Sequence, residues 1–578
     1  MAISIDSMKL SRNIVAHTNP LPYFRDEKKH ETPKKNNTLQ KEDLDHFGYE
    51  MAFRILPYQK RDRYMQDSQQ ISATSIILEN DFLMASFLPE YGGRLYSLYD
   101  KQNKKELLFS PSSISPSSLS SSGDAWFPGG ISFNNYSTFE PVFFAKVCGE
   151  NDYEFLRMYN YERTGGTVWQ IDFHLPEGAK ELYAHVTIYN DQDFSVPLSW
   201  RTVISLTEDA SCRFFSGTKD VLFPIPDSKR FQRTFSYGRA TLPNIPQLGS
   251  SDASFVGSLD KAGAYFLQNP TTAEAPWSSI VYEDGHGFLE RSTQPMRSRG
   301  VTYWGNESPG KYWKQLLQNS EEHSYLEVSS LLTPTPLHGM DIAARDVISY
   351  TQGFGAITLN SDDAMEPSYE LSHAIVNAVV NTVIPAGKVT ELHKTFSLFA
   401  SLPCSKVLFA GTGWGALENT RRIMSDAPIL PEHLFFPAES FTEEQYDWLA
   451  LLSHEELPEL QENELPLAWM VDINYLPLLK DYIVKYPESV KARLHAGIIL
   501  YENGFPKDAV KIWQEALRIR SLPILSRNLS YSASSAGFTL EALSYMEHIH
   551  WASASNLDVA FWEEYFELLL EDGHYRKM

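Results

Sequence analysis

Glu327 is the side chain in this sequence that is best placed to do acid–base chemistry. It ends the strand-like segment Tyr325-Leu326-Glu327, and two tryptophans, Trp304 and Trp313, lie just upstream. An indole face stacks on the C–H surface of a sugar, and a fixed carboxylate accepts a proton from a sugar hydroxyl or from an attacking water. The pattern therefore fits a carbohydrate site, and it fits equally well a surface glutamate beside two core tryptophans.

Two glycine-containing segments earlier in the chain carry further candidates. Arg94 follows a glycine pair at 92–93, which permits a tight turn from which the guanidinium could reach a cleft. Trp126 and Asn134 flank a second glycine pair at 129–130, where backbone and rings could approach a ligand closely. An amide such as that of Asn134 both donates to and accepts from sugar hydroxyls. A hairpin with a surface arginine and an irregular packed loop are the structural alternatives.

Three more side chains could complete a proton-transfer site. Glu140 supplies a second carboxylate soon after Asn134, and Asp284 supplies a third. His286 lies between two glycines, and such a loop position suits the edge of a pocket. A solvated loop histidine is the alternative.

The composition excludes several classes of partner. The chain has 578 residues and a formal net charge of -23, which argues against nucleic acid and against an anionic membrane surface. Neutral ligands such as sugars remain compatible with that charge. Cys148, Cys212 and Cys404 have no metal-like spacing and read as free thiols of a reducing compartment. With no apolar leader in residues 1–15 and no long apolar run, the expected location is the cytoplasm, and neither a metal nor a cofactor is predicted.

Hydrophobic periodicity divides the chain into a strand-rich and a helix-rich part. Between about residues 71 and 399 short alternating segments predominate; in 180–190, for example, every second residue is apolar. The other predicted strands are 74–78, 83–87, 95–99, 169–175, 198–206 and 390–399. With few helices predicted there, the pattern indicates a large antiparallel β-sandwich.

The C-terminal part reads as paired helices. Thr442 and Gln445 form a capping-box pair, and apolar stripes follow on either side of Gly504. Gly537 comes 33 residues after Gly504, close to the repeat length of about 34 residues in tetratricopeptide proteins. We therefore expect a partly mobile N-terminal arm over residues 1–58, a sandwich over 59–402, a helical linker region over 403–480 and a tetratricopeptide-like tail over 481–578.

Several separated motifs together resemble one bacterial family of unassigned function. Its members join a galactose-mutarotase-like β-supersandwich to a tetratricopeptide-type helical tail, so the implied fold class is mainly β plus α. The resemblance spans nearly everything after about residue 55, and it rests on the segments 89–94, 126–134, 137–141, 304–313, 325–327, 413–422 and 469–471.

The resemblance implies a concave sugar-binding face with Glu327 as general base. In aldose epimerases a glutamate within a Leu-Glu pair removes the anomeric proton, while a histidine protonates the ring oxygen. This chain departs from that pattern, because the strand that carries the epimerase histidine corresponds roughly to residues 199–202, where Arg201 stands and no histidine occurs. An acidic residue and a histidine-containing insertion of the family are also replaced here, by Ser132 and a shortened loop.

Three functions are compatible with these observations. The first is a glycoside hydrolase that acts on an intracellular oligosaccharide or glycoside, with Glu327 paired with Glu140 or Asp284. In it the sugar would lie against Trp126, Trp304 and Trp313, with its hydroxyls held by Arg94, Asn134 and His286. The second is a sugar 1-epimerase in which His286 is the acid. The third is a non-catalytic sugar-binding or scaffolding protein, whose helical tail could bind a protein partner, support self-association, or simply buttress the sandwich.

Overall fold

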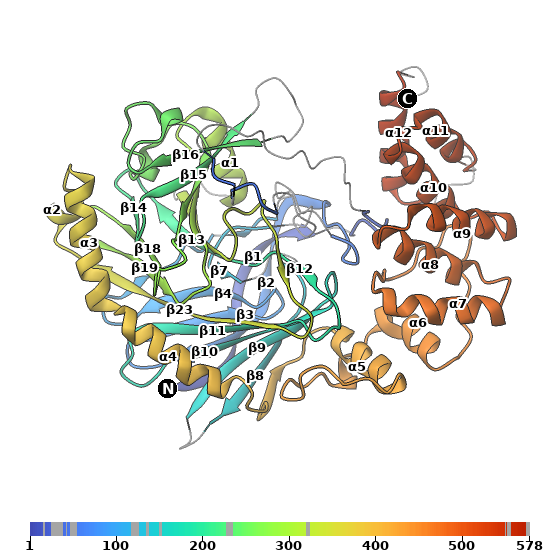
Figure 1. Ribbon diagram of the computed structural model, residues 1–578, viewed down its shortest axis with the longest axis horizontal. Coiled ribbons are helices and arrows are strands. Elements are labelled where there is room, and N and C mark those ends of the chain that lie inside the picture. Colours follow the sequence, from blue (N-terminus) through green and yellow to red (C-terminus); the bar gives the residue numbers. More distant parts are fainter. Residues whose placement is uncertain are drawn as a thin grey trace.

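The computed structural model describes residues 1–15, 18–24, 39–41, 43–46, 55–111, 113–116, 126–133, 138–149, 153–226, 235–318, 324–549, 551 and 557–573. A β-sheet part and a stack of helices lie side by side (Figure 1). This arrangement confirms the predicted fold class, a large antiparallel sheet domain followed by a C-terminal helical region.

The larger sheet has thirteen strands. Its neighbouring strands are antiparallel apart from a short parallel pair between β1 and β6. In sheet order it runs β16 (Phe235–Thr241), β15 (Asp220–Pro226), β17 (Gly263–Gln268), β20 (Ser298–Tyr303), β21 (Ser324–Leu331), β13 (Arg201–Glu208), β7 (Ile131–Ser132), β4 (Arg94–Asp100), β3 (Leu83–Leu88), β2 (Tyr64–Glu79), β1 (Ala2–Val15) and β6 (Ser113–Ile114), with β5 (Lys105–Glu106) beside β4.

The second sheet has nine strands and packs face to face on the first through one large apolar core. Its order is β14 (Arg213–Ser216), β18 (Trp277–Val281), β19 (His286–Ser292), β23 (Val347–Thr358), β11 (Glu181–Tyr189), β10 (Thr167–His174), β9 (Glu154–Glu162), β8 (Phe143–Cys148) and β24 (Lys406–Phe409). A separate pair joins β12 (Val196–Leu198) to β22 (Met340–Ile342).

Alternation along the strands explains how the core is filled. In β11, Leu182, Ala184 and Val186 enter the core between the sheets, whereas Tyr183 and His185 point to the other face. That other face is covered by helix, so both faces of the strand are buried. His174 on β10 stacks on Phe396 of the covering helix, with ring centroids 3.8 Å apart.

The covering helices correct one sequence prediction. Residues 390–399 were expected to form a strand, but they lie in α4 (Ala386–Phe399), next to α3 (Tyr369–Val383). Val389 and Phe396 are buried seven residues apart, which places both on one face of a helix but would place them on opposite faces of a strand. Two further helices of the sheet part are α1 (Ser308–Gln318) and α2 (Ser361–Ala364).

The helical region follows β24. Its α-helices are α5 (Trp414–Met424), α6 (Glu443–Leu452), α7 (Leu476–Lys485), α8 (Val490–Glu502), α9 (Pro506–Ile519), α10 (Pro523–Ser535), α11 (Thr539–Glu547) and α12 (Val559–Glu571). The predicted capping box is confirmed at the start of α6, where the backbone N–H of Thr442 donates to Oε1 of Gln445 at 2.9 Å. Gly504 lies in the turn between α8 and α9, and Gly537 lies in the turn between α10 and α11, as their spacing predicts. Both glycines have positive φ.

The N-terminal residues differ from the predicted arm. Instead of an arm, β1 is a full strand of the larger sheet, paired along its length with β2. Residues 18–24 then lie on the helical region, where Phe24 packs against Tyr501, Trp513 and Tyr531. The carbonyl oxygens of this segment are also used, since that of Phe24 accepts a hydrogen bond from the Tyr531 hydroxyl at 3.1 Å.

Two further backbone contacts fix the same segment. Trp469 donates through Nε1 to the carbonyl oxygen of Pro20 at 3.1 Å, and Arg527 donates to that of Pro22 at 2.8 Å. Residues 18–24 thus occupy a surface formed by α8, α9 and α10, in the manner of an extended peptide. The chain itself ties its sheet part to its helices.

Truncating Phe24 should loosen this junction. Phe24 is 1% exposed, so Phe24→Ala is expected to destabilise the helical region by about 3 kcal/mol through lost burial and the cavity left behind. Hydrogen exchange of α8–α10 should become faster while that of the central strands stays unchanged. Phe194→Ala, at a position 48% exposed, is the control and should change neither. Unaltered exchange in α8–α10 of the Phe24 variant would contradict the account.

Candidate functional site

Glu327 lies in the middle of the larger sheet. On β21 it pairs with Ser205 of β13 on one side and with Thr302 of β20 on the other. Alternation sends Leu326 and Val328 into the sandwich core, which leaves Glu327 on the opposite face of the sheet. Pairing with strands on both sides fixes the backbone at Glu327, and with it the face of the sheet from which the side chain leaves.

The Glu327 carboxyl group is poorly solvated. The residue as a whole is half-buried, but Oε1 is wholly buried and has no hydrogen-bond partner among the described residues. Burial raises the pKa of Glu327 to about 7, and the charges of Arg201 and Arg94 oppose this rise only in part. A carboxyl group with this pKa can both take up and release a proton near neutral pH.

Arg94 is fixed from three directions. Its Nη1 donates to the carbonyl oxygens of Phe127 at 2.9 Å and Gly129 at 2.7 Å, and its guanidinium lies over the Phe127 ring, 3.9 Å from the centroid. Burial lowers the pKa of Arg94 to about 10, which the charge of Glu327 partly offsets. Nε is buried without a hydrogen-bond partner among the described residues. Arg94 therefore holds segment 127–129 in place and still has an unused donor.

The glycine pair at 129–130 serves packing rather than ligand contact. Gly130 has φ +66°, and a Cβ there would lie 2.2 Å from the carbonyl oxygen of Leu95. The backbone N–H of Gly129 donates to Oγ of Ser205 at 2.9 Å, so the hydroxyl next to Glu327 in the sheet is already engaged. The glycines let this segment lie directly on β4 and β13.

Aromatic rings form a wall next to Glu327. Tyr325 stacks on Phe109 with centroids 5.1 Å apart, and Trp304 lies 5.8 Å from Tyr325. Trp126 packs on the same small cluster. The Tyr325 hydroxyl and Trp304 Nε1 are both buried. Burial raises the pKa of Tyr325, the charge of Glu327 adds to that rise, and a hydrogen bond between the Tyr325 and Trp304 side chains acts to lower it.

Among the described residues, Glu327 Oε1 and Arg94 Nε are buried with no hydrogen-bond partner, while Tyr325 Oη and Trp304 Nε1 are paired only with each other. Leaving such atoms unpaired costs free energy, and native proteins seldom do so without a reason. Donors, an acceptor and aromatic faces together are what a polyhydroxylated ligand would pair with. We call these four residues, with Arg201 and Trp126, the Glu327 site.

The structure brings together only part of the predicted set. Glu327, Arg94, Trp126 and Trp304 belong to the site, whereas Trp313 on α1 has its ring against Tyr312. Asn134 lies outside the described residues.

The three predicted acid–base partners of Glu327 lie elsewhere. Glu140 forms an ion pair with Arg61 at 2.9 Å, in contact with another pocket. Asp284 is exposed and pairs with Lys105 at 2.8 Å, a contact that lowers the pKa of Asp284. His286 begins β19 in the nine-stranded sheet, with Nδ1 3.3 Å from the Thr358 hydroxyl. The arrangement of the strands in the two sheets gives these three residues other partners than Glu327. That arrangement is not evident from their spacing in the sequence.

Arg201 and Tyr325 are site residues that were not assigned a role from the sequence. Arg201 begins β13, and its charge is close enough to lower the pKa of Glu327. The available signal was an arginine in the segment that corresponds roughly to the histidine-bearing strand of the aldose epimerase pattern. For Tyr325 the signal was its position two residues before Glu327 in a predicted strand. Side chains two residues apart in a strand point to the same face of the sheet.

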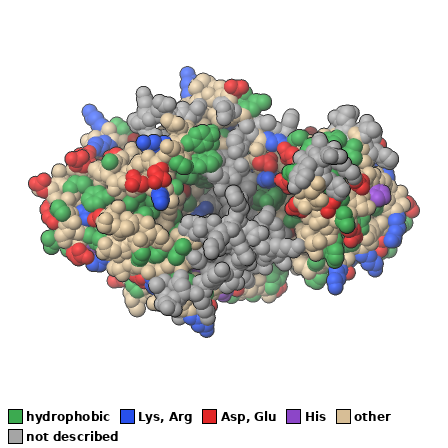
Figure 2. Space-filling model, turned by 90° about the horizontal axis from the view of Figure 1, so that it is seen from above, with side chains coloured by type: hydrophobic (Ala, Val, Ile, Leu, Met, Phe, Trp, Pro, Cys, Tyr) green, Lys and Arg blue, Asp and Glu red, His purple; other side chains and the backbone are tan. Residues whose placement is uncertain are grey.

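The described residues contain no helix that is both long and apolar enough to cross a membrane. Within the same residues, no three His, Cys, Asp or Glu side chains are grouped so that they could hold a metal ion. Acidic and basic side chains are interspersed on the face seen in Figure 2.

Comparison with known proteins places the fold in context. Residues 51–334 match the family model described as "Domain of unknown function (DUF5107)". A TPR-domain containing protein from Parabacteroides distasonis, 14% identical, superposes with a TM-score of 0.64 over 98% of this chain and 83% of its own. The two-part architecture is therefore shared along the whole chain.

Mutarotase-like proteins are also among the structural neighbours. A galactose mutarotase-like protein from Clostridium acetobutylicum is 10% identical with a TM-score of 0.36, covering 50% of this chain and 96% of its own. A galactose mutarotase related enzyme from Lactobacillus acidophilus is 8% identical with a TM-score of 0.32, covering 50% and 98%.

The raised pKa of Glu327 makes a prediction about stability. Between about pH 4.5 and pH 7 the folded protein keeps a proton that the unfolded chain has released, so wild-type stability falls as pH rises through this window. Glu327→Gln should therefore be more stable than wild type by roughly 1–3 kcal/mol at about pH 8 and nearly equal to it at about pH 4. Urea unfolding at the two pH values measures this. The control, Glu307→Gln at an exposed position, should show no such pH-dependent gain, and an equal gain there would contradict the assignment.

Proposed function

We propose that this chain acts on a carbohydrate at the Glu327 site and that Glu327 transfers the proton. The observation that carries the proposal is a carboxyl group on a central strand with a pKa of about 7, one oxygen of which is buried and has no hydrogen-bond partner among the described residues. Structural carboxylates are normally paired, whereas a poised and unpaired one is typical of a general acid or base. The tryptophan and tyrosine rings beside it supply the faces on which a sugar stacks.

Sugar 1-epimerisation is the reaction that these groups suit best. Glu327, as carboxylate, takes the proton of the anomeric hydroxyl; the C1–O1 bond gains double-bond character as the bond from C1 to the ring oxygen breaks. The ring oxygen then needs a proton or a strong hydrogen-bond donor. Rotation about C1–C2 and reclosure return the proton from Glu327 to the new anomeric oxygen, so atoms and electrons balance.

The donor to the ring oxygen cannot be His286, which belongs to the other sheet. Arg94 is a better candidate, because its Nε is buried and unused and its pKa is lowered to about 10. A guanidinium with a lowered pKa gives a stronger hydrogen bond to a developing alkoxide. This arrangement replaces the histidine of the mutarotase pattern by arginine.

Glycoside hydrolysis, favoured on the sequence, has less support from the geometry. It needs a second carboxylate at about 5–10 Å from the first, and both Glu140 and Asp284 are engaged in ion pairs elsewhere. Glu327 is instead accompanied by Arg94 and Arg201. Hydrolysis therefore serves here as an alternative outcome of the test.

Anomer exchange measured by NMR on a panel of freshly dissolved aldoses tests the proposal. Wild-type protein should speed exchange without releasing reducing sugar from glycosides. Because the base form of Glu327 is the active one, kcat/KM should rise with pH through about 7. Glu327→Gln should lower it by at least about a hundredfold.

Glu307→Gln is the matched control and should retain full activity. If the protein instead cleaves glycosides and this activity depends on Glu327, the reaction is hydrolysis and not epimerisation. Sugar binding without either reaction would leave the site non-catalytic and contradict the proposal.

A further inference from the structure

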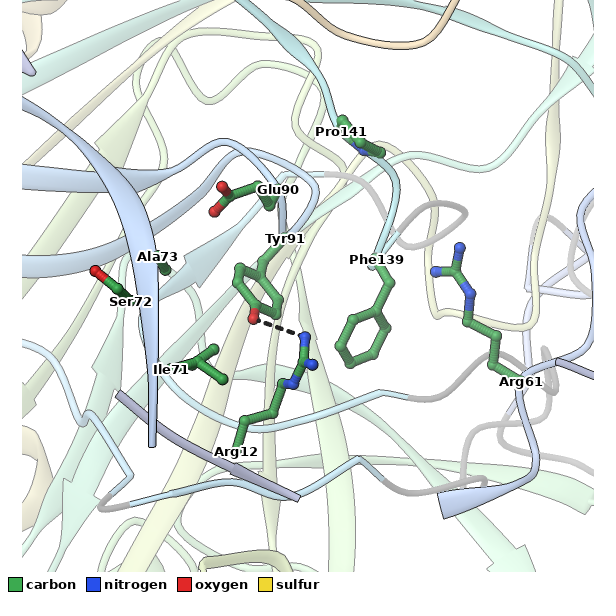
Figure 3. Close-up of a pocket in the computed structure, with 9 residues that line it drawn as sticks. All are labelled: Arg12, Arg61, Ile71, Ser72, Ala73, Glu90, Tyr91, Phe139 and Pro141. Atoms are coloured by element: carbon green, nitrogen blue, oxygen red, sulfur yellow. Dashed lines mark hydrogen bonds between the residues drawn. The ribbon is translucent and has the colours of Figure 1, made fainter. Parts of the chain in front are cut away.

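A second pocket opens on the larger sheet, apart from the Glu327 site. It has a volume of about 480 Å³ and lies where β1 and β2 meet the turn before β4 and the segment 139–141. That volume is in the range of small-molecule sites. Figure 3 shows Arg12, Tyr91 and Phe139 directed toward one another across it.

Arg12 contributes a positive charge and an unused hydrogen-bond donor to this pocket. Its Nη1 donates to the Tyr91 hydroxyl at 3.2 Å (Figure 3), and its Nε is buried without a hydrogen-bond partner among the described residues. No ion pair joins it to any carboxylate in the part of the chain that the structure describes. The guanidinium of Arg12 is half-buried, its partner is neutral, and one of its donors is unused, so its positive charge is not balanced locally. This is notable because the chain as a whole carries a net charge of -23.

The other charged groups of the pocket are already engaged. Arg61 pairs with Glu140 at 2.9 Å and lies over the Phe139 ring, 5.5 Å from its centroid. The Glu90 carboxylate accepts hydrogen bonds from the backbone N–H of Thr74 at 3.1 Å and from its hydroxyl at 2.9 Å. In Figure 3, Glu90 points away from Arg12. Of the two described arginines that line the pocket, Arg12 is therefore the one without a carboxylate partner among the described residues.

The rest of the lining suits a ring with an apolar face. Ile71 and Ala73 of β2 form one wall, and the Phe139 and Tyr91 rings, 5.7 Å apart, form another. Phe127 contacts Tyr91 of this pocket and Arg94 of the Glu327 site, so one ring connects the two regions.

We infer that the Arg12 pocket is a second ligand site and that it binds an anionic sugar, whose carboxylate or phosphate pairs with the Arg12 guanidinium while its ring lies against Phe139 and Tyr91. A guanidinium binds both kinds of anion through paired N–H donors. The inference depends on the pocket alone and does not require catalysis at Glu327. It also gives a role to the motif around Glu140, since the adjacent Phe139 and Pro141 line this pocket.

Calorimetric titration with three probes tests this inference: D-glucuronate, D-glucose 6-phosphate and D-glucose. We expect at least one anion to bind wild-type protein about tenfold more tightly than glucose, with an affinity that falls as salt is added. Arg12→Gln should abolish the preference, whereas Arg12→Lys should keep part of it. Lys9→Gln, an equal change of charge at an exposed position of the same strand, should bind like wild type.

Comparing the two anions distinguishes a carboxylate ligand from a phosphate ligand. Unchanged anion binding in Arg12→Gln would overturn the inference, as would equal affinity for all three probes, or no saturation by either anion up to about 10 mM. The Glu327→Gln variant should keep the anion preference. If that variant loses it while Arg12→Gln retains it, the anion binds at the Glu327 site and not in this pocket.

Discussion

The burial of one carboxyl group in the middle of a sheet is the constraint on which this structure depends. Glu327 has strands on both sides, so its backbone is fixed by pairing with Ser205 and Thr302, and its side chain leaves the sheet on the face opposite the sandwich core. Its Oε1 is buried with no hydrogen-bond partner in the part of the chain that the structure describes, and this burial raises the pKa of the group to about 7. The two nearby arginines supply positive charge, which limits that rise without abolishing it.

The residues around Glu327 are held in place by contacts of their own, although burying its carboxyl group is unfavourable. Arg94 is held by two carbonyl oxygens and an aromatic ring, and the segment that supplies them is pressed against β4 by a glycine pair. Within the described residues, Glu327 Oε1 and Arg94 Nε nevertheless lack hydrogen-bond partners. A site that keeps donors and acceptors unpaired sacrifices stability, as binding and catalytic sites commonly do.

Much of the fold was predictable because the strands follow simple rules. Alternation in 180–190 gives β11 and its two faces, and Thr442 with Gln445 gives the start of α6. The strand predicted over 390–399 was wrong because the residue that shows the helical spacing with Phe396 is Val389, which lies just before the predicted segment. Residues 18–24 could not be placed, since their contacts are with residues more than four hundred positions away.

The candidate site was predictable only in part, for a related reason. Glu327, Trp304 and Trp126 were found because side-chain chemistry and strand periodicity point to them. Their true companions depend on sheet order: Arg201 reaches Glu327 because β13 is the neighbour of β21, and His286 does not because β19 belongs to the other sheet. Sequence distance says little about such pairings when strands far apart in the chain become adjacent.

The central claim is that Glu327 is a poised proton-transfer group in a sugar site. The most direct measurement is the carboxyl carbon resonance of Glu327, followed by NMR from acid to alkaline pH in ¹³C-labelled protein and assigned with Glu327→Gln. The account predicts a pKa of about 7 that moves when a bound aldose is added. Titration at the ordinary pKa of a glutamate, with no response to any sugar, would contradict it.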